Sequence, residues 1–269
     1  LLYSSKSWRK KIKIEMLIKS YVNIIIFFFF ILLSQFMSSK SISFEGNQKI
    51  ESFYESKKIL RDIFQNNQYT FYCNCKYEYK KPIFKTCDYK PYKNFKRANR
   101  IEWEHIVPAS RFGKKFESWK YGNLKCVKNG KKFKGRKCAR KISKKFRLME
   151  SDLYNLQPTI GEINQQRQNF KMSIIPGEKR NYGKCDFEVQ NRFIEPSPNI
   201  RGDIARTYFY MAENYSNYIK LEKSELSLFS KWNEADPVDE WECKKSKLIQ
   251  KSQKNLNKFL AKDCKELDK

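Results

Sequence analysis

Three stretches of the chain repeat apolar residues at the spacing of an α-helix. The first, residues 48–68, places aliphatic and aromatic side chains three to four positions apart, which predicts an amphipathic helix that packs on a core. Residues 201–219 and 223–234 carry the same kind of stripe. Aromatic residues in such stripes belong more often to a core than to a ligand site, so we predict two core-facing helices there.

A further helix is predicted in the middle of the chain. It begins within Met149–Asn155 with Ser151 as the N-cap, is interrupted at Pro158 and continues through residues 160–170. The lysine-rich tail that follows Cys243 resembles a surface helix pinned by a cysteine near its end.

Two stretches have the composition of β-strands. Tyr69–Cys75 is aromatic and alternating, which predicts a strand before a polar, lysine-rich turn. Arg100–Val107 predicts a second strand, which Pro108 stops because proline cannot donate a hydrogen bond to a neighbouring strand. Residues 113–145 are rich in glycine, lysine and asparagine and predict a long basic loop, and loops of this length are usually functional or disordered.

The N-terminal part has the pattern of a secretory signal peptide. An unbroken apolar run at residues 24–33 follows several lysines and precedes small residues, and it is too short to span a bilayer comfortably. An uncleaved membrane anchor is the alternative. Because the chain opens with Leu1, we expect Met16 to be the start of translation. We assign residues 1–40 to upstream residues and signal peptide, and 41–269 to one catalytic domain.

The net charge of the chain indicates a class of binding partner but does not indicate an activity. The chain has 269 residues and is 40% apolar, which is enough to bury the core of one large domain. With 56 Lys and Arg against 29 Asp and Glu, the net charge is +27, and such a field concentrates polyanions such as nucleic acid or anionic lipid near the surface. A solvated lysine-rich surface would have the same composition.

Eight cysteines lie in the predicted mature part. An even number of cysteines behind an export signal predicts four disulfide bonds. The alternative is a zinc site, against which stand the absence of any Cys-x-x-Cys pair and the presence of a single histidine.

That single histidine, His105, directly follows Glu104 near the end of the second predicted strand. A lone histidine is usually structural. Here a base with a near-neutral pKa stands beside a carboxylate in an otherwise cationic chain, and this pair suits metal-assisted attack on a phosphodiester. Strand alternation would send the two side chains to opposite faces, so we expect a bulge or a strand end to bring them together.

Cleavage of a phosphodiester needs a water nucleophile, a group that takes its proton, and positive charge on the phosphate. Glu104 can supply one hard oxygen ligand and the side-chain amide of Asn155 a second. Few protein ligands together with several waters suit Mg²⁺. Arg136, in the basic loop, can grip a phosphate oxygen with its planar guanidinium group.

Five blocks of sequence carry a resemblance to a known family. They are TFYCNC at 70–75, IEWEHIVPA at 101–109, MESDLYNLQP at 149–158, RGDIARTYFYM at 201–211 and DEWEC at 239–243. In this order they resemble the signature blocks of the bacterial endonuclease I family. Several long blocks in order are far more specific than one short motif.

The resemblance implies an α+β fold: a mixed, helix-rich single domain with an embedded ββα-metal (His-Me finger) motif, stapled by disulfides. It implies cleavage of DNA, and in relatives also of RNA, without marked sequence preference, leaving 5′-phosphate and 3′-hydroxyl ends. On that pattern His105 is the general base, Glu104 and Asn155 hold Mg²⁺, Arg136 binds the phosphate and Glu102 supports the waters of the metal. We expect a monomer that is secreted or periplasmic. The alternative is a secreted protein that binds nucleic acid without cutting it.

The chain departs from the family pattern in the basic loop. This loop is longer before Arg136, and the spacing from Arg136 to Cys138 is one residue shorter, so Lys137 or Arg140 could take the place of Arg136. Three further arginines lie in or beside the matched blocks and either hold flanking phosphates or form surface ion pairs: Arg147, Arg167 and Arg206.

Sequence alone cannot choose a disulfide pairing among eight half-cystines. Their order and the resemblance together favour four bridges: Cys126–Cys138, Cys75–Cys87, Cys73–Cys264 and Cys185–Cys243. The first would hold Arg136 within reach of a metal-bound phosphate.

Overall fold

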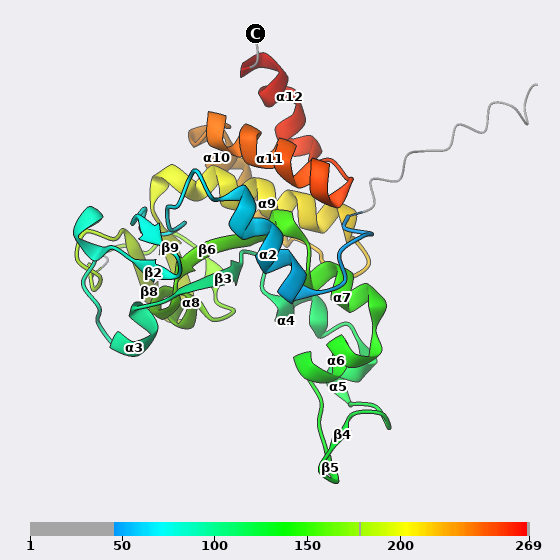
Figure 1. Cartoon of the computed structure of the whole chain (residues 1–269). Coiled ribbons are helices and arrows are strands. Elements are labelled where there is room, and N and C mark those ends of the chain that lie inside the picture. The colour runs from blue at the N-terminus through cyan, green and yellow to red at the C-terminus, as the bar shows by residue number, and fades with distance from the viewer. Residues whose placement is uncertain (1–45, 178, 268–269) are drawn as a thin grey trace, which may run out of the picture. The chain divides into compact units, whose positions relative to one another are not determined.

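A two-stranded antiparallel sheet lies at the centre of the molecule. In the computed structural model, which describes residues 46–177 and 179–267, β3 (Ile101–His105) pairs with β6 (Leu156–Ile160) so that His105 lies opposite Leu156. The helix α8 (Gly161–Arg167) follows β6 without a loop and packs against both strands (Figure 1). The predicted signal peptide and the alternative anchor lie outside the described residues.

Helices from both halves of the chain cover this sheet. The N-terminal α2 (Phe53–Ile63) and the C-terminal α9 (Arg201–Asn214), α10 (Lys223–Ala235) and α11 (Glu240–Gln253) bury one shared apolar core with β6 (Figure 1). The last helix, α12 (Lys258–Leu267), packs Phe259 against this core and buries Leu260 and Cys264 in a second, small cluster. No helix among the described residues is long and apolar enough to cross a membrane.

Shorter elements complete the chain. The short helices are η1 (Phe84–Thr86), α3 (Phe95–Ala98), α4 (Ala109–Gly113), α5 (Glu117–Lys120), α6 (Arg136–Ile142), α7 (Lys144–Glu150), η2 (Leu153–Asn155) and η3 (Pro198–Ile200). The short strands are β1 (Tyr77–Glu78), β2 (Lys81–Pro82), β4 (Val127–Lys128), β5 (Lys131–Lys132), β7 (Lys171–Met172), β8 (Phe187–Gln190) and β9 (Phe193–Pro196). The last three form one sheet in the order β7-β9-β8.

The helices predicted from apolar periodicity are confirmed, with adjusted ends. The helix predicted at 48–68 is α2, which begins after Ser52 because the Ser52 side chain accepts the backbone N–H of Glu55. Those predicted at 201–219 and 223–234 are α9 and α10. The predicted tail helix is present as α12, which Cys264 ties to Cys243.

The strand predicted at Tyr69–Cys75 is wrong. This segment folds on itself in a turn: the backbone N–H of Thr70 donates to the carbonyl of Cys75, the N–H of Cys75 returns to the Thr70 hydroxyl, and Asn74 has a left-handed φ of 49°. The extended pair forms just beyond it, at β1 and β2. Asparagine tolerates the left-handed conformation, which lets a local turn replace the expected strand.

The helix predicted from Met149 to Pro158 is also wrong. Ser151 caps the C-terminus of α7 rather than starting a helix, and the chain then passes through η2 into the strand β6. Pro158 lies inside β6, opposite Trp103. A two-stranded sheet has only edge strands, where a missing N–H is tolerated, and the Pro158 carbonyl still accepts the N–H of Phe71.

The predicted basic loop at 113–145 is basic but not structureless. It contains α5, the hairpin β4–β5 and α6, and it leads into α7. Helix α6 begins at Arg136, after Gly135 has adopted a φ of 75°. This local structure gives Arg136 a fixed origin on a helix.

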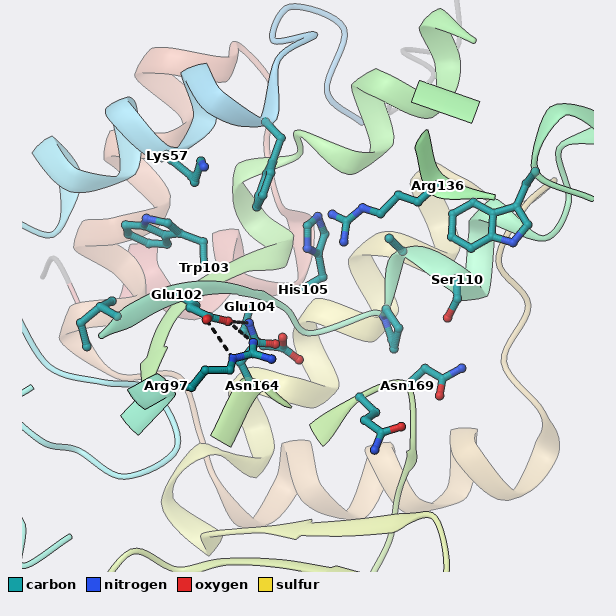
Figure 2. Close-up of a pocket in the computed structure, with 16 residues that line it drawn as sticks. Lys57, Arg97, Glu102, Trp103, Glu104, His105, Ser110, Arg136, Asn164 and Asn169 are labelled. Carbon is teal, nitrogen blue, oxygen red and sulfur yellow. Dashed lines mark hydrogen bonds and ion pairs between the residues drawn. The ribbon is translucent and has the colours of Figure 1, made fainter. Parts of the chain in front are cut away.

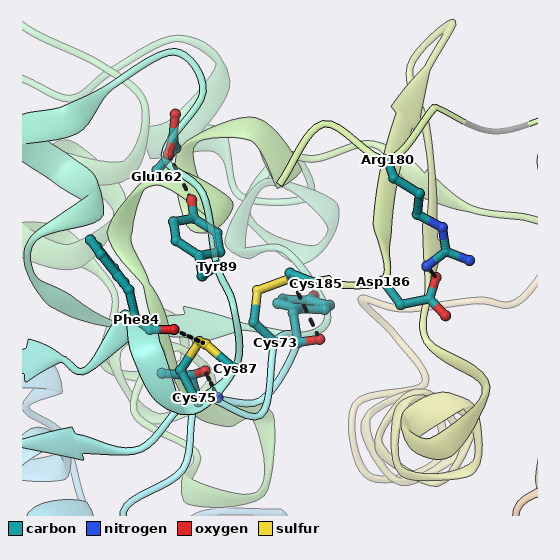
Figure 3. The surroundings of a disulfide bond; sticks show 11 residues. Cys73, Cys75, Phe84, Cys87, Tyr89, Glu162, Arg180, Cys185 and Asp186 are labelled. Atoms are coloured by element: carbon teal, nitrogen blue, oxygen red, sulfur yellow. Dashed lines mark hydrogen bonds and ion pairs between the residues drawn. A yellow bond between two sulfur atoms is a disulfide. The ribbon is translucent and has the colours of Figure 1, made fainter. Parts of the chain in front are cut away.

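All eight cysteines form disulfides, so the zinc alternative is excluded for these thiols. The predicted bridges Cys126–Cys138 and Cys75–Cys87 are confirmed. The two predicted long-range bridges are wrong: the structure has Cys73–Cys185, shown beside Cys75–Cys87 in Figure 3, and Cys243–Cys264. The physical reason is distance, because a disulfide requires Cα atoms within about 7 Å, and these pairs lie at 4.7 and 5.3 Å.

Candidate active site

A cavity of about 600 Å³ opens along the free edge of β3. Four of the residues predicted for the site line it: Glu102, Glu104, His105 and Arg136. Figure 2 shows His105 on one side of the β3 ribbon and Glu104 on the other. The expected bulge is unnecessary, because a cavity at an edge strand can be reached from both faces of the sheet.

His105 is held as a neutral imidazole. Its Nε2 lies 2.8 Å from the main-chain oxygen of Glu150, and because a carbonyl only accepts, Nε2 carries the proton and Nδ1 keeps its lone pair. The ring packs 5.0 Å from that of Phe53. Burial, together with the positive charge of Arg136, lowers the pKa of His105 to about 3. At neutral pH the imidazole is therefore uncharged, and its Nδ1 lone pair is unprotonated.

Glu104 lies buried on the opposite face of β3. Its Oε1 is 2.8 Å from Nε of Arg167, yet neither atom has a hydrogen-bond partner within the described part of the chain. Burial raises the pKa of Glu104 to about 7, although the positive Arg167 acts to lower it. A buried carboxylate oxygen without a hydrogen bond is costly unless a further positive group satisfies it.

Asn155, predicted as the second metal ligand, does not line this cavity. Its Oδ1 accepts the N–H of Val107 at 2.7 Å and its Nδ2 donates to the carbonyl of Val107 at 3.0 Å. The side chain is fully buried and binds the chain just beyond β3 to η2. In this structure both polar atoms of the Asn155 side chain bond to Val107, and the residue is not among those that line the cavity with Glu104.

Asn164, which the sequence analysis missed, lines the cavity instead. It lies on α8, and its Nδ2 donates to Glu102 Oε2 at 2.8 Å (Figure 2). That bond holds the amide nitrogen, so the amide oxygen is the atom that is available to a ligand. The signal that could have revealed Asn164 is the order of strand, strand and helix, but Leu156–Ile160 was not predicted as a strand.

Glu102 is held by three positive or amide groups. Its carboxylate accepts hydrogen bonds from Arg97, from Arg100 at 2.7 Å and from Asn164. It therefore orients Asn164 rather than facing the cavity as a free charge.

Arg136 reaches the cavity from the start of α6. Its Nε donates to Glu150 Oε1, and its guanidinium carbon lies 5.6 Å from the centre of the Phe53 ring. The Nη2 atom is buried and has no hydrogen-bond partner among the residues described. Arg140 also binds the Glu150 carboxylate, but it does not line the cavity, and Lys137 is exposed. Of the three candidates, Arg136 fits the phosphate-binding role.

The groups present fit a hard divalent cation bound beside an anion. The Glu104 carboxylate, whose Oε1 is ion-paired with Arg167 but accepts no hydrogen bond in the described part of the chain, and the amide oxygen of Asn164 are hard ligands of the type that Mg²⁺ prefers. The unsatisfied Nη2 of Arg136 suits a phosphate oxygen. In the described residues no cluster of three His, Cys, Asp or Glu side chains could hold a metal, so most ligands of such an ion would be waters.

Two of the three arginines predicted for flanking phosphates are buried and cannot hold them. Arg167 is fully enclosed and its Nη2 donates to the carbonyl of Ile106 at 2.6 Å. Arg206 is paired with Glu242 in the interior at 3.0 Å between Nε and Oε1. Arg147 is half-buried and binds Glu51 at 2.9 Å, away from the cavity. Ion pairing was the alternative prediction, and the pairs of Arg167 and Arg206 are internal rather than at the surface.

Known proteins are similar in sequence to this chain over most of its length. Residues 33–264 match the family described as Endonuclease I. The chain is 40% identical to Endonuclease-1 of Buchnera aphidicola subsp. Acyrthosiphon pisum (strain APS), over 85% of this chain and 88% of that protein. It is also 40% identical to a periplasmic deoxyribonuclease of Aeromonas hydrophila, over 81% and 88%, and 38% identical to an extracellular deoxyribonuclease of the same organism, over 80% and 91%. The chain therefore belongs to the endonuclease I family.

Proposed function

We propose that this protein is a metal-dependent endonuclease that hydrolyses DNA without marked sequence preference and leaves 5′-phosphate and 3′-hydroxyl ends. The observation that carries the proposal is the neutral His105, whose Nδ1 is free, in one cavity with the Glu104 carboxylate and with an Arg136 guanidinium nitrogen that has no hydrogen-bond partner among the described residues. The names of the deoxyribonuclease relatives support DNA as the substrate.

In the proposed reaction, His105 Nδ1 takes a proton from a water molecule, whose oxygen attacks the phosphorus as the P–O3′ bond breaks. A second water molecule donates a proton to the leaving O3′ oxygen, which becomes the 3′-hydroxyl. Arg136 Nη2 binds a non-bridging phosphate oxygen and opposes its growing charge. Glu104 and Asn164 would hold a divalent cation, which when bound supplies positive charge to the phosphate and the leaving oxygen. Glu102 fixes the amide of Asn164, and the carbonyl of Glu150 fixes the tautomer of His105. The antiparallel pair β3–β6 followed by α8 supports the ββα-metal motif.

We further propose that the protein works in the periplasm or outside the cell. Four disulfide bonds require an oxidising compartment, and two of the relatives are named extracellular and periplasmic deoxyribonucleases. Activity on RNA and a monomeric state stay predictions, to be tested by an RNA digest run in parallel and by sedimentation.

A plasmid-nicking assay on the purified mature protein tests the function. We expect nicking of supercoiled plasmid with Mg²⁺, none with a chelator, and recovery when Mg²⁺ is added back. Radiolabelling of the product ends with and without phosphatase treatment identifies the 5′-phosphate. Tight DNA binding without any nicking at any divalent ion tested would instead support the noncatalytic alternative.

Binding to DNA is expected to depend steeply on salt and little on sequence. Contacts to phosphates release counterions, so affinity should fall by about a thousandfold or more between 50 and 200 mM salt if six or more phosphates are contacted. Filter binding of His105→Ala to several unrelated duplexes measures this. A strong preference for one short sequence would contradict it.

The disulfide Cys126–Cys138 is expected to matter for activity beyond its effect on stability. It ties Cys138, the third residue of α6 and two positions after Arg136, to Cys126 in the preceding loop. The two cysteines are separated by 12 positions in sequence. Cys75–Cys87 has the same separation and so is a matched control. Each double alanine variant should lose about 3 kcal/mol of unfolding free energy in the chain-entropy model.

Only the Cys126→Ala, Cys138→Ala variant is expected to lose nicking rate at a temperature where both variants remain folded. Urea titrations and nicking assays on the two variants measure the two effects. Equal loss of rate in both would mean that the bridge acts on stability alone.

A further inference from the structure

The segment between Glu117 and Glu150 concentrates positive charge to a degree unlike the rest of the chain. It contains 13 Lys and Arg residues and no Asp or Glu. At its centre residues 121–135, which we name the basic arm, carry the hairpin β4–β5. Like charges repel, so gathering these lysines and arginines in one segment does not stabilise the fold. A bound polyanion would offset that repulsion.

The lysines of the hairpin face solvent and are not used by the fold. Lys128, Lys131, Lys132 and Lys134 are exposed. Within residues 46–177 and 179–267 none of the four forms an ion pair. Figure 1 shows the hairpin projecting from the body of the domain below α5 and α6. Four free ammonium groups on one projection can contact several phosphates at once.

The base of the arm is bonded to the wall of the active-site cavity. The N–H of Gly135 donates to the carbonyl of Trp119 at 3.0 Å, and Trp119 lines the cavity. The bridge Cys126–Cys138 joins the arm to α6, on which Arg136 lies. The arm therefore has a defined origin next to the residue proposed to bind the scissile phosphate.

The arrangement suits the backbone of duplex DNA better than a single strand. Proteins that bind single strands stack successive bases on several exposed aromatic rings, whereas the arm has one exposed aromatic residue, Tyr121 at its first position, and the half-buried Phe133. The six residue-to-residue steps from Gly130 to Arg136 span at most about 20 Å in extended form. Because phosphates follow one another every 3.4 Å along each strand, that reach covers roughly six base pairs.

We propose that the basic arm is a duplex-binding element that contacts DNA phosphates up to roughly six base pairs from the cut. This inference rests on the proposed function for its substrate. The arm supplies affinity and not chemistry, since its lysines lie outside the cavity that contains His105.

Two variants with equal charge loss test the proposal. The arm variant carries Lys128→Gln, Lys131→Gln, Lys132→Gln and Lys134→Gln. The control variant carries Lys231→Gln, Lys244→Gln, Lys251→Gln and Lys262→Gln, exposed lysines of α10, α11 and α12 at the opposite end of the domain in Figure 1. Both are made in the His105→Ala background, which prevents cleavage during binding measurements with a 30-base-pair duplex.

We expect the arm variant to bind that duplex at least about tenfold more weakly at 0.1 M salt, with a salt slope shallower by about 2 to 4, as lost phosphate contacts require. The control variant should keep the parent slope within about 1. On a six-base-pair duplex, which is too short to contact Lys131 and Lys132 when it occupies the active site, the difference between arm variant and parent should be smaller than on the 30-base-pair duplex. Thermal unfolding confirms that both variants fold.

Equal weakening in the two variants would overturn the proposal, because net charge would then explain the effect. An unchanged slope in the arm variant would also overturn it. Nicking is measured with His105 restored. If the parent nicks DNA but the arm variant keeps the parent's binding and salt slope, the arm proposal fails and the proposed function stands. Absence of nicking by the parent, with a positive arm test, would remove the nuclease function and keep the arm as a DNA-binding element.

Discussion

His105→Ala is expected to lower the nicking rate by about two to four orders of magnitude, the usual contribution of a general base. In the structure no other histidine exists to replace it, and the ring offers the free Nδ1 to the cavity. DNA binding should persist, because the side chain carries no charge at neutral pH when its pKa is about 3.

The measurement is single-turnover nicking at saturating Mg²⁺, with duplex binding and thermal unfolding as controls. Removal of the ring leaves the Glu150 carbonyl without its donor, which costs about 1–3 kcal/mol if water does not replace it. A variant that is folded and binds DNA but cuts at nearly the normal rate would exclude His105 as the base.

Asn164→Ala is expected to weaken the response to Mg²⁺, whereas Asn155→Ala is expected to lower stability. Asn164→Ala removes an oxygen proposed to hold the cation, so the Mg²⁺ concentration for half-maximal activity should rise by at least about tenfold, given that even indirect supporting residues change metal affinity by that factor. Its unfolding temperature should change little, because the residue lies in the wall of a cavity.

Asn155→Ala should instead lower the free energy of unfolding by about 1–3 kcal/mol, since it leaves the buried N–H and carbonyl of Val107 unpaired. Its Mg²⁺ titration should superimpose on that of the parent at a temperature where it is folded. The two asparagines differ only in position, so each variant is the control for the other. If Asn155→Ala shifted the Mg²⁺ titration and Asn164→Ala did not, the assignment made from sequence would be correct and ours wrong.

The contrast between these two asparagines identifies a feature that the sequence does not determine, namely which amide oxygen faces the cavity. Asn155 belongs to a long matched block and carries the right functional group, so the sequence favoured it as a ligand. Both polar atoms of its side chain are hydrogen-bonded to the backbone of Val107, which lies 48 residues earlier, just beyond the end of β3. Which oxygen faces the cavity depends on the register of β3 against β6, and apolar periodicity contains no information on that register.

Strand β6 was misread for a related reason. All five of its residues are buried, so it lacks the alternation that identifies a half-buried strand, and it contains a proline. Only its pairing with β3, about fifty residues away in sequence, makes it a strand. Short buried runs cannot be told from helical segments by periodicity alone.

What the sequence determined by itself was local or short in range. The 3.6-residue stripes predicted α2, α9 and α10, because one face of each must leave water. The even number of cysteines behind an export signal predicted four disulfide bonds, and the two bridges with a separation of 12 needed the family resemblance as well.

The tertiary structure alone decided the partners of groups that are distant in sequence. It paired Cys73 with Cys185 rather than Cys264, and it buried Arg167 and Arg206 in internal ion pairs, although as arginines of a basic chain they were candidates to face DNA. An unpaired charge is too costly to bury, so the fate of each arginine depends on whether folding brings a carboxylate to it. That meeting is a property of the packed chain and cannot be read from the order of its residues.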